Sequence, residues 1–232
     1  IEIIESMNWG DEGYLLSKRK FRENANIISV FSSKKGKVAG IVYGGNSRKI
    51  RNYLQISNKI FISHNSKNQN RMGYFKTELI KPISPFYFND KERTSALTSL
   101  CSLLNILLPE EQPNKRIYQI FDDLLNSLNF DNWIILYIFF EISLIKELGY
   151  DVNLSIYKEK NDNNSYTKKI NIDGFSYEVP NYLMQKKVPE IITNILIKKS
   201  LYFTRNIIIN KFFLPNNLIF PKSRVILENY FN

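Results

Sequence analysis

Residues that could carry catalytic or metal chemistry are few in this chain. Cys101 is the only cysteine and His64 the only histidine, so these 232 residues can form neither an internal disulfide nor a four-ligand Cys/His zinc site. Cys101 falls on the apolar stripe of a predicted helix, and we expect a small buried side chain. His64 lies beside a loop, where we expect a surface or edge residue. Asp122 and Asp123 look like a metal-binding pair, but they fall on the polar side of an amphipathic segment, which predicts a solvated face.

Motifs that mark common enzyme classes are also absent from the sequence. There is no glycine-rich phosphate loop, no dinucleotide-binding fingerprint and no nucleophile elbow. The sequence therefore predicts a protein that is not an enzyme, with no catalytic residue, no cofactor and no metal.

Basic residues alternate with aromatic ones in the first third of the chain. Phosphate groups release counterions when lysine or arginine neutralises them, so such a surface predicts salt-sensitive DNA binding with little sequence preference. The predicted DNA-binding residues are Lys18, Arg19, Lys20, Arg22, Lys34, Lys35, Lys37, Arg48, Lys49 and Arg51. The aromatic candidates for stacking on unpaired bases are Phe31, Tyr43, Tyr53, Tyr74 and Phe75. Most aromatics in a small barrel are core, so we expect only one or two to face outward, and we favour Tyr43 and Tyr53.

The positive charge of the chain is unevenly distributed. The net charge is +10 and the sequence pI is about 9.5. Residues 1–81 carry 15 lysines and arginines against 6 acidic residues, residues 82–155 carry 5 against 10, and residues 156–232 carry 12 against 6. An A/T-rich coding sequence would also enrich lysine, but it would spread lysine evenly. The segregation favours an anionic partner, either nucleic acid or an acidic membrane face.

No segment resembles a membrane span or a secretory signal. The most apolar stretch, residues 133–145, is shorter than the roughly 18 residues that a span requires, and it contains Glu141. Residues 1–8 contain acidic residues and no apolar signal core. We expect a soluble cytoplasmic protein that does not bind membranes.

The first 81 residues predict a small β-barrel. Short runs of β-forming residues, bounded by polar or glycine-containing turns, occur at residues 14–20, 27–33, 38–43, 59–64 and 74–80. Gly36 provides the tight turn between the second and third runs, and Gly44-Gly45 ends the third. Five such strands suit an OB-fold barrel, although an SH3-like barrel would show a similar pattern.

From Pro82 onward the apolar residues recur at helical spacing. Asn89 or Asp90 can cap a first helix that Pro109 stops, and Gly149 can end a third helix of residues 132–148. Further segments are a second helix around residues 117–128, a polar insertion at about residues 155–180 with a hairpin at Asp173-Gly174, one or two helices from Pro189 to Phe213, and a last helix at residues 225–231. The predicted fold class is α+β, with an OB-fold domain at residues 1–81 and a mainly helical domain at residues 82–232.

A series of short motifs runs along nearly the whole chain. They are Asp11-Glu12-Gly13-Tyr14-Leu15-Leu16-Ser17, Glu23-Asn24-Ala25, Lys35-Gly36-Lys37, Gly40, Tyr43-Gly44-Gly45-Asn46-Ser47-Arg48, Leu54-Gln55, Ala96-Leu97 through Leu107-Leu108-Pro109-Glu110, Glu141 through Leu148-Gly149-Tyr150, and Leu218-Ile219-Phe220-Pro221 with Arg224. In this order the motifs resemble those of the RecO family of DNA repair proteins.

The resemblance implies an N-terminal OB fold and a helical C-terminal domain. It also implies a non-enzymatic protein that binds single- and double-stranded DNA and anneals complementary strands. The implied partners are RecR, the acidic C-terminal tail of single-strand-binding protein, and also RecF and RecA. Family members usually start near Met7, so residues 1–6 are expected to be an extension outside the fold.

The insertion differs from that of many RecO proteins. Many members carry a four-cysteine zinc site there, whereas residues 155–177 of this chain contain no cysteine. We therefore expect the insertion to hold its shape without a metal or to be partly mobile. A second basic surface, for DNA or for the acidic tail, is predicted at Lys186, Lys187, Lys198, Lys199 and Arg205, although solvated helix faces would explain these residues equally well.

Three functions follow as hypotheses of decreasing weight. The first is a recombination mediator that anneals strands. The second is a DNA-independent adaptor whose helical domain docks partner peptides while the barrel has a structural role. The third, a hydrolase or nuclease, lacks any nucleophile or metal-ligand constellation.

Overall fold

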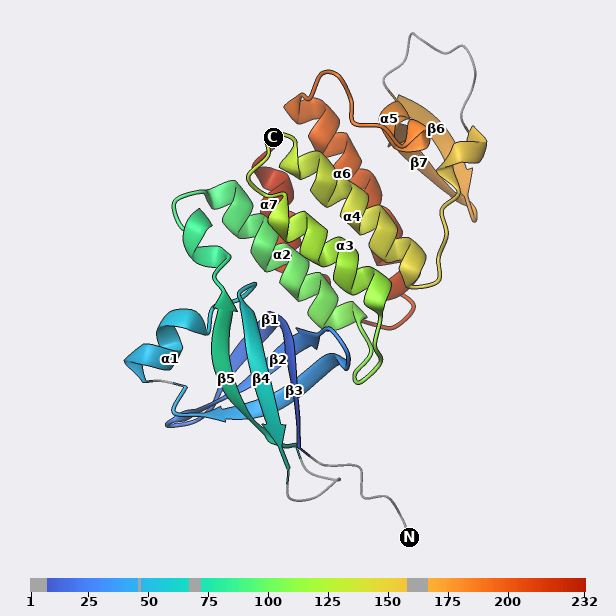
Figure 1. Cartoon of the computed structure of the whole chain (residues 1–232). Coiled ribbons are helices and arrows are strands. Elements are labelled where there is room, and N and C mark those ends of the chain that lie inside the picture. The colour runs from blue at the N-terminus through green and yellow to red at the C-terminus, as the bar shows by residue number, and fades with distance from the viewer. Residues whose placement is uncertain (1–7, 46, 67–71, 158–166) are drawn as a thin grey trace. The chain divides into compact units, whose positions relative to one another are not determined.

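The computed structural model describes residues 8–45, 47–66, 72–157 and 167–232 (Figure 1). The chain forms two compact units, residues 1–118 and residues 119–232, and each unit is considered separately. The predicted extension at residues 1–6 and residues 158–166 of the predicted insertion lie outside the described residues.

A five-stranded closed barrel dominates the first unit. Its strands pair in the order β1-β2-β3-β5-β4 (Figure 1). They are β1 (Trp9–Arg22), β2 (Ala25–Ser32), β3 (Gly36–Tyr43), β4 (Lys59–Asn65) and β5 (Tyr74–Lys81). The predicted OB-type barrel is confirmed, with each predicted strand present.

Strand β1 closes the barrel because it pairs on both sides. Its first part, from Trp9 to Tyr14, pairs with β4, and its second part, from Gly13 to Arg22, pairs with β2. The register shifts between Leu15 and Ser17, and such a bulge bends a strand. The inward residues form one apolar core: Leu15, Ile28, Val30, Val38, Val42, Leu54, Ile60, Ile62 and Phe75.

A short helix, α1 (Arg48–Tyr53), links β3 to β4 and was not predicted. Ser47 caps its first turn by accepting a hydrogen bond from the Ile50 amide. Ile50 and Tyr53 pack against the barrel core, which leaves the basic residues of the helix exposed. Six residues are too few to show a helical period in the sequence.

Helices follow the barrel within the same compact unit. After the 3₁₀ turn η1 (Ser84–Tyr87), α2 (Lys91–Leu107) begins at the predicted cap Asp90, whose carboxylate accepts a hydrogen bond from the Arg93 amide. The Glu111 amide, in the link from α2 to α3 (Lys115–Asn126), donates to the Lys37 carbonyl oxygen at 2.8 Å. Because α2 belongs to the same compact unit as the barrel, the domain boundary at residue 81 stays a prediction.

The second unit is helical with a two-stranded insertion. After α3 its elements are α4 (Trp133–Glu147), η2 (Leu154–Tyr157), β6 (Thr167–Ile172), β7 (Phe175–Pro180), α5 (Asn181–Gln185), α6 (Asn194–Ile208), the π-helical turn η3 (Ile209–Phe213) and α7 (Lys222–Asn229). Among the described residues, no helix is both long and apolar enough to cross a bilayer.

Most turns of this unit agree with the sequence, and one helix start does not. Gly149 ends α4 with φ +96°, and Asp173-Gly174 turns the predicted hairpin with both residues at positive φ. The predicted helix start at Pro189 is wrong, since α6 begins only at Asn194. Thr193 caps α6 by accepting a hydrogen bond from the Leu196 amide at 3.2 Å, and such a cap stabilises a helix start by about 1 kcal/mol. The short helix α5 was not predicted.

A fully buried ion pair joins three helices of this unit. The guanidinium of Arg224, in α7, donates to both carboxylate oxygens of Glu141, in α4, at 2.5 and 3.0 Å. It also donates to the Leu201 carbonyl oxygen of α6 at 2.8 Å, and Thr204 of α6 donates to Glu141. Burial disfavours the guanidinium charge, but the charges of Glu141, Tyr137 and Glu228 and the hydrogen bonds to Glu141 outweigh burial, so the pKa of Arg224 is raised.

Candidate nucleic-acid interface

The outward face of strands β1, β2 and β3 is the part of the barrel best suited to a polynucleotide. Directly paired residues point to the same side of a sheet, so the register assigns whole rows to this face. The rows that alternate with the buried rows are Ser17–Ser29–Ala39, Arg19–Ile27–Ile41 and Arg22–Ala25–Tyr43. They contain small, apolar and basic residues and no acidic one. OB folds bind oligonucleotides on the corresponding face.

Two tyrosines stand at one end of this face. Tyr43, at the end of β3, is 56% exposed, and Tyr74, at the start of β5, is 36% exposed. Their ring centroids lie 6.4 Å apart in an edge-to-face arrangement, and Tyr74 pairs with Ile41 of the face. Exposed rings of this kind can stack on bases. The exposure of Tyr43 agrees with its predicted role, which itself stays a prediction.

The other three aromatic candidates are less accessible. Phe31 and Phe75 are 1% and 3% exposed, so the stacking role considered for them is wrong; both fill the interior of their unit. Tyr53 is half-buried in α1, and its hydroxyl donates to the Thr77 carbonyl oxygen at 2.6 Å. It therefore helps to attach α1 to β5.

Exposed basic side chains occur in the second half of β1 and in α1, the segments on either side of β2 and β3 in the sequence. Arg19, Lys20 and Arg22, near the end of β1, are exposed, as are Arg48, Lys49 and Arg51 of α1. The Arg22 guanidinium lies 5.1 Å from the centroid of the exposed Phe21 ring. Glu23, in the β1–β2 turn, is the one acidic residue of that turn.

Lys18 holds the helix in place instead of presenting a free charge. Its ammonium donates to the Leu54 carbonyl oxygen, at the end of α1, at 2.9 Å. Burial, and then the nearby charge of Arg51, lower the pKa of Lys18. The structure thus brings Arg51 and the second half of β1 together, with Lys18 as the link.

The lysines of the β2–β3 turn lie at the opposite end of β2. Ala25, the first residue of β2, pairs with Arg22 and Tyr43, whereas Ser32, the last, pairs with Gly36. Eight residues of strand separate these ends by about 23 Å. The ten predicted DNA-binding residues therefore do not gather at one end of the barrel, because β2 carries the chain from one end to the other.

At this second basic end the Lys34 and Lys35 side chains are exposed, while Lys37 and the backbone of the turn have internal contacts. The Lys37 ammonium donates to the Asn105 carbonyl oxygen of α2 at 2.9 Å, and the Lys34 amide donates to the Asp11 carboxylate at 2.8 Å. The Lys35 ammonium lies 5.7 Å from the Trp9 ring centroid. A DNA-binding role for these three lysines stays a prediction, with no support from their arrangement.

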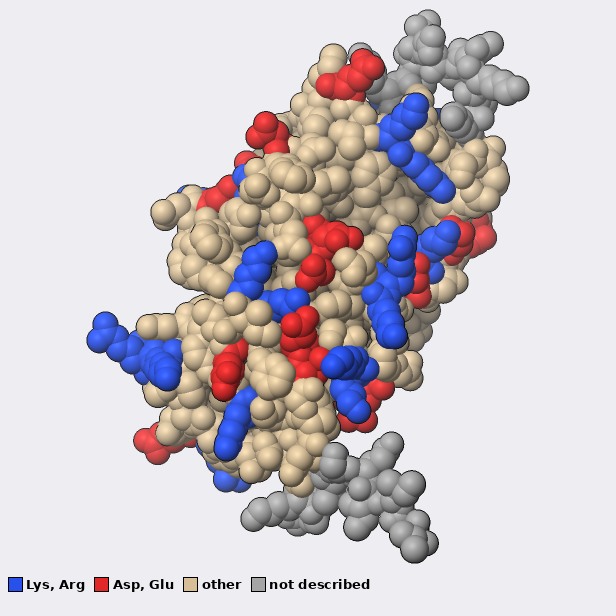
Figure 2. Space-filling model, viewed as in Figure 1, with Lys and Arg blue, Asp and Glu red and all other residues tan. Residues whose placement is uncertain are grey.

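The outer face of β1, β4 and β5 has mixed charge. Phe61 of β4 is flanked in its row by Glu12 and Glu78, and Glu12 pairs with Lys59 at 2.9 Å. Figure 2 shows acidic and basic side chains interspersed over the β4 and β5 side of the barrel. Such a face is less suited to a polyanion than the β1–β2–β3 face.

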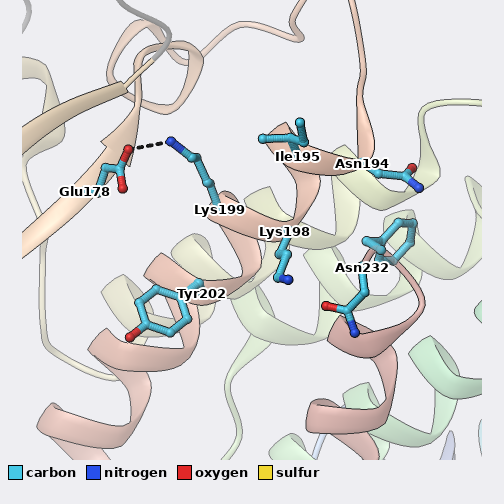
Figure 3. Close-up of a pocket in the computed structure, with 8 residues that line it drawn as sticks. Glu178, Asn194, Ile195, Lys198, Lys199, Tyr202 and Asn232 are labelled. Carbon is cyan, nitrogen blue, oxygen red and sulfur yellow. Dashed lines mark hydrogen bonds and ion pairs between the residues drawn. The ribbon is translucent and has the colours of Figure 1, made fainter.

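A pocket of about 450 Å³ lies on α6 in the second unit (Figure 3). Its lining residues are Glu178, Asn194, Ile195, Lys198, Lys199, Tyr202, Phe231 and Asn232. Two lysines of the predicted second basic surface, Lys198 and Lys199, therefore line one cavity. Lys199 is bound to the Glu178 carboxylate of β7 at 2.6 Å, as Figure 3 shows.

The other three residues of the predicted second surface lie outside the lining of this pocket. Lys186 and Lys187 are exposed just after α5. Arg205 is half-buried, pairs with Glu228 at 3.3 Å, and lies 4.8 Å from the Tyr202 ring centroid. Two of the five residues thus share this pocket, and the second basic surface stays a prediction.

The residues first considered for catalysis have structural environments. Cys101 is buried, as predicted, and burial raises the pKa of its thiol to about 12. His64 is half-buried at the end of β4, with its ring stacked on Trp9 at 5.0 Å. Asp122 and Asp123 accept hydrogen bonds from Asn126 and Gln119 on the surface of α3. Within the described ranges, His, Cys, Asp and Glu residues form no group of three that could hold a metal ion.

Comparisons with known proteins agree with this architecture. The family model for the N-terminal part of recombination protein O matches residues 7–83, and that for its C-terminal part matches residues 89–156. The chain belongs to the RecO family. The first RecO match covers the barrel, and the second covers α2 to η2, so α6 and its pocket lie outside the matched residues.

Individual relatives carry the same family name. The DNA repair protein RecO of Ehrlichia chaffeensis is 33% identical over 163 residues, which cover 69% of this chain and 66% of the relative. That of Cereibacter sphaeroides (strain ATCC 17029 / ATH 2.4.9) is 33% identical over 149 residues, which cover 64% of this chain and 62% of the relative. The chain therefore spans slightly less than two thirds of the length of these RecO relatives.

One solved structure also matches, at a low level. It is an asparaginyl-tRNA synthetase from Entamoeba histolytica, with 11% identity and a TM-score of 0.29, covering 77% of this chain and 41% of the synthetase. A likeness this low carries no argument about the fold or the function.

Proposed function

We propose that this chain is a DNA repair and recombination mediator whose barrel binds DNA along the outward face of β1, β2 and β3. The observation that carries the proposal is the combination of exposed Tyr43 and Tyr74 with the flanking arginines Arg19 and Arg22. The tyrosine rings stack on unpaired bases, while the guanidinium groups bind the phosphates on either side. Membership in the RecO family supports the same role.

Strand annealing follows from this type of surface. A face that binds phosphates and stacks on any base holds single strands without sequence preference, and neutralising phosphates lowers the repulsion between two complementary strands. Duplex DNA binds through phosphates alone. Neither step needs ATP, a catalytic residue or a cofactor. The protein acts in the cytoplasm at nucleoid DNA, where it works with RecR, and also RecF, to load RecA at gaps after DNA damage.

A salt titration of binding to labelled single-stranded DNA tests the proposal. Each arginine that binds a phosphate contributes about one unit to the slope of log affinity against log salt. The double substitution Arg19→Glu/Arg22→Glu is expected to lower the slope by about two units and to slow ATP-independent annealing of complementary oligonucleotides. Unchanged affinity and slope would instead favour the DNA-independent adaptor.

A docking role for the second unit has its own support. We propose that the acidic tail of single-strand-binding protein binds the α6 pocket, because Lys198 and Lys199 provide positive charge beside the apolar side chains Ile195, Tyr202 and Phe231. The substitution Lys198→Glu is expected to weaken binding of an acidic tail peptide and to leave DNA binding by the barrel unchanged. Equal peptide affinity in Lys198→Glu and wild type would contradict docking at this pocket.

A further inference from the structure

The zinc-less insertion hairpin is fastened to the following helices by side-chain contacts. Near one end of β7, Glu178 accepts hydrogen bonds from Lys199 of α6 at 2.6 Å and from Thr167 of β6 at 2.7 Å. At the hairpin turn, Asp173 pairs with Lys211 of η3 at 2.5 Å. These two ion pairs connect the hairpin to the helical segment at separate points.

Two further contacts fasten the middle of the hairpin. The Tyr177 ring packs edge-to-face on Phe203 with centroids 5.9 Å apart. The Asn210 amide donates to the Tyr177 hydroxyl at 2.9 Å. The hairpin therefore keeps attachments even when one ion pair opens.

The Glu178 ion pair differs from the Asp173 ion pair in its position. Lys199 and Glu178 both line the α6 pocket, whereas Lys211 and Asp173 do not (Figure 3). The Lys199 and Glu178 side chains are 41% and 44% exposed, so water and ligands reach the pair. The Glu178 carboxylate thus already binds Lys199, one of the two pocket lysines that a carboxylate ligand would bind.

We propose that Glu178 is a built-in competitor that an acidic peptide displaces from Lys199, which loosens the β6–β7 hairpin from α6. The proposal rests on the docking of an acidic peptide at this pocket. The hydrogen bond to Glu178 shows that the Lys199 ammonium can bind a carboxylate oxygen at this place. Ile195 and Tyr202 provide an apolar surface in the same pocket. The ligand is therefore a polypeptide segment that combines carboxylates with a bulky apolar side chain.

Displacement requires that the internal pair be weak but formed, and both conditions hold. The hydrogen bond from Lys199, and then that from Thr167, lower the pKa of Glu178, so the carboxylate is ionised at neutral pH. Exposed ion pairs contribute little net free energy, so a peptide with several carboxylates can outcompete one glutamate. By linkage, a ligand that loosens the hairpin binds more tightly once the hairpin contact is removed.

Two matched substitutions on the hairpin test the proposal. Glu178→Gln removes one negative charge and releases Lys199, and Asp173→Asn removes one negative charge and releases Lys211. The two acids are five residues apart on the hairpin, about 16 Å along a strand, so the general electrostatic effect is similar while only the first change touches the pocket. The probe is a short fluorescent peptide rich in aspartate that also contains phenylalanine.

At low salt, Glu178→Gln is expected to bind the probe about two- to fivefold more tightly than wild type, as the loss of one weak internal competitor predicts. Asp173→Asn is expected to bind like wild type. The double variant Glu178→Gln/Lys199→Gln should bind the probe no more tightly than the single variant Lys199→Gln, because Glu178 acts through Lys199. Hydrogen exchange of the β6 and β7 amides should quicken when the probe binds wild type, and it should already be quicker in free Glu178→Gln.

The outcomes separate this proposal from the docking that it rests on. If Lys198→Glu weakens probe binding while Glu178→Gln and Asp173→Asn bind alike, docking stands and the competitor role is overturned. Unchanged hydrogen exchange in Glu178→Gln also overturns it. If wild type and all variants fail to bind the probe, both the docking and the competition are wrong.

Discussion

The two ends of strand β2 are equally basic in sequence but differ in the folded barrel. At the β1–β2 end, Arg19 and Arg22 are exposed beside Tyr43. At the β2–β3 end, Lys37 donates to a carbonyl oxygen of α2, and the Asp11 carboxylate fixes the backbone of the turn. The difference teaches that counting the cations of a segment is not enough to predict an anion-binding surface. The cations must also lie on one face and be free of hydrogen bonds to other parts of the protein. Four predictions examine this difference, at groups with partners inside the protein and at groups that face solvent.

The largest effect is expected at the most fully engaged cation, Arg224. Arg224→Met leaves the Glu141 carboxylate buried without its partner, which should cost about 3–5 kcal/mol of stability. Urea unfolding followed by fluorescence of the buried Trp133 reports on this unit. The double variant Glu141→Gln/Arg224→Met should recover much of the loss, and fully additive losses would contradict a coupled pair.

The next effect is expected at the aromatic part of the β1–β2 end. Tyr43→Ala should weaken binding of single-stranded DNA by about 1–2 kcal/mol, roughly tenfold, because one stacking surface is lost. Its effect on duplex binding should be smaller, since paired bases do not stack on side chains. Tyr53→Phe is the control, because Tyr53 bonds to Thr77 inside the unit. Equal affinities of Tyr43→Ala and wild type would argue against this face.

A smaller effect is expected at the β2–β3 end of the barrel, where the exposed Lys34 and Lys35 lie away from Tyr43. Lys34→Glu/Lys35→Glu makes the same change of charge as Arg19→Glu/Arg22→Glu, at the other end of β2. Its effect on DNA affinity should stay within about threefold, because these residues would act on the DNA only through their long-range electrostatic field. Filter binding at low salt compares the two double variants directly. Similar losses in both would show that DNA follows both ends of the barrel.

The smallest effect concerns pH. Burial tends to raise the pKa of Asp11, but hydrogen bonds from Ser32, from the Lys34 amide and from Ser33 outweigh it, so the pKa lies below its ordinary value. A lowered folded-state pKa adds stability above the unfolded value of about 4, and this stability is lost as pH falls further. Thermal unfolding between neutral pH and pH of about 3 should therefore show a steeper acid loss in wild type than in Asp11→Asn. Parallel curves would show that Asp11 contributes nothing.

The strands and long helices were predictable because their determinants are local. Period-two patterns, the turns at Gly36 and Asp173-Gly174, and the Asp90 cap each act within a few residues. The short helix α1 and the start of α6 were not predictable from such patterns. Pro189 was a plausible helix start in the sequence, but α6 begins at Asn194, directly after the Thr193 cap.

The candidate site was predictable in residue type but not in arrangement. Phe75 lies in the barrel core, whereas Phe31 is on the outer side of β2 and is buried by contact with Tyr118 of α3, a contact that alternation within the strand could not predict. Glu141, in the most apolar helix, was used only as evidence against a membrane span, although a buried carboxylate also needs a partner. Identifying that partner as Arg224, 83 residues later, required the fold.

The double pairing of β1 has a consequence for the order of assembly. The β1–β2 and β2–β3 pairs join neighbours in the chain, whereas the pairing of Trp9–Tyr14 with β4 must wait for residues 59–64. Contacts between sequence neighbours form early in folding, and distant ones form late. The sheet that presents Tyr43 and Arg19 is thus expected to form as a meander first, and the closing strands then curl it into a cylinder around the apolar side chains.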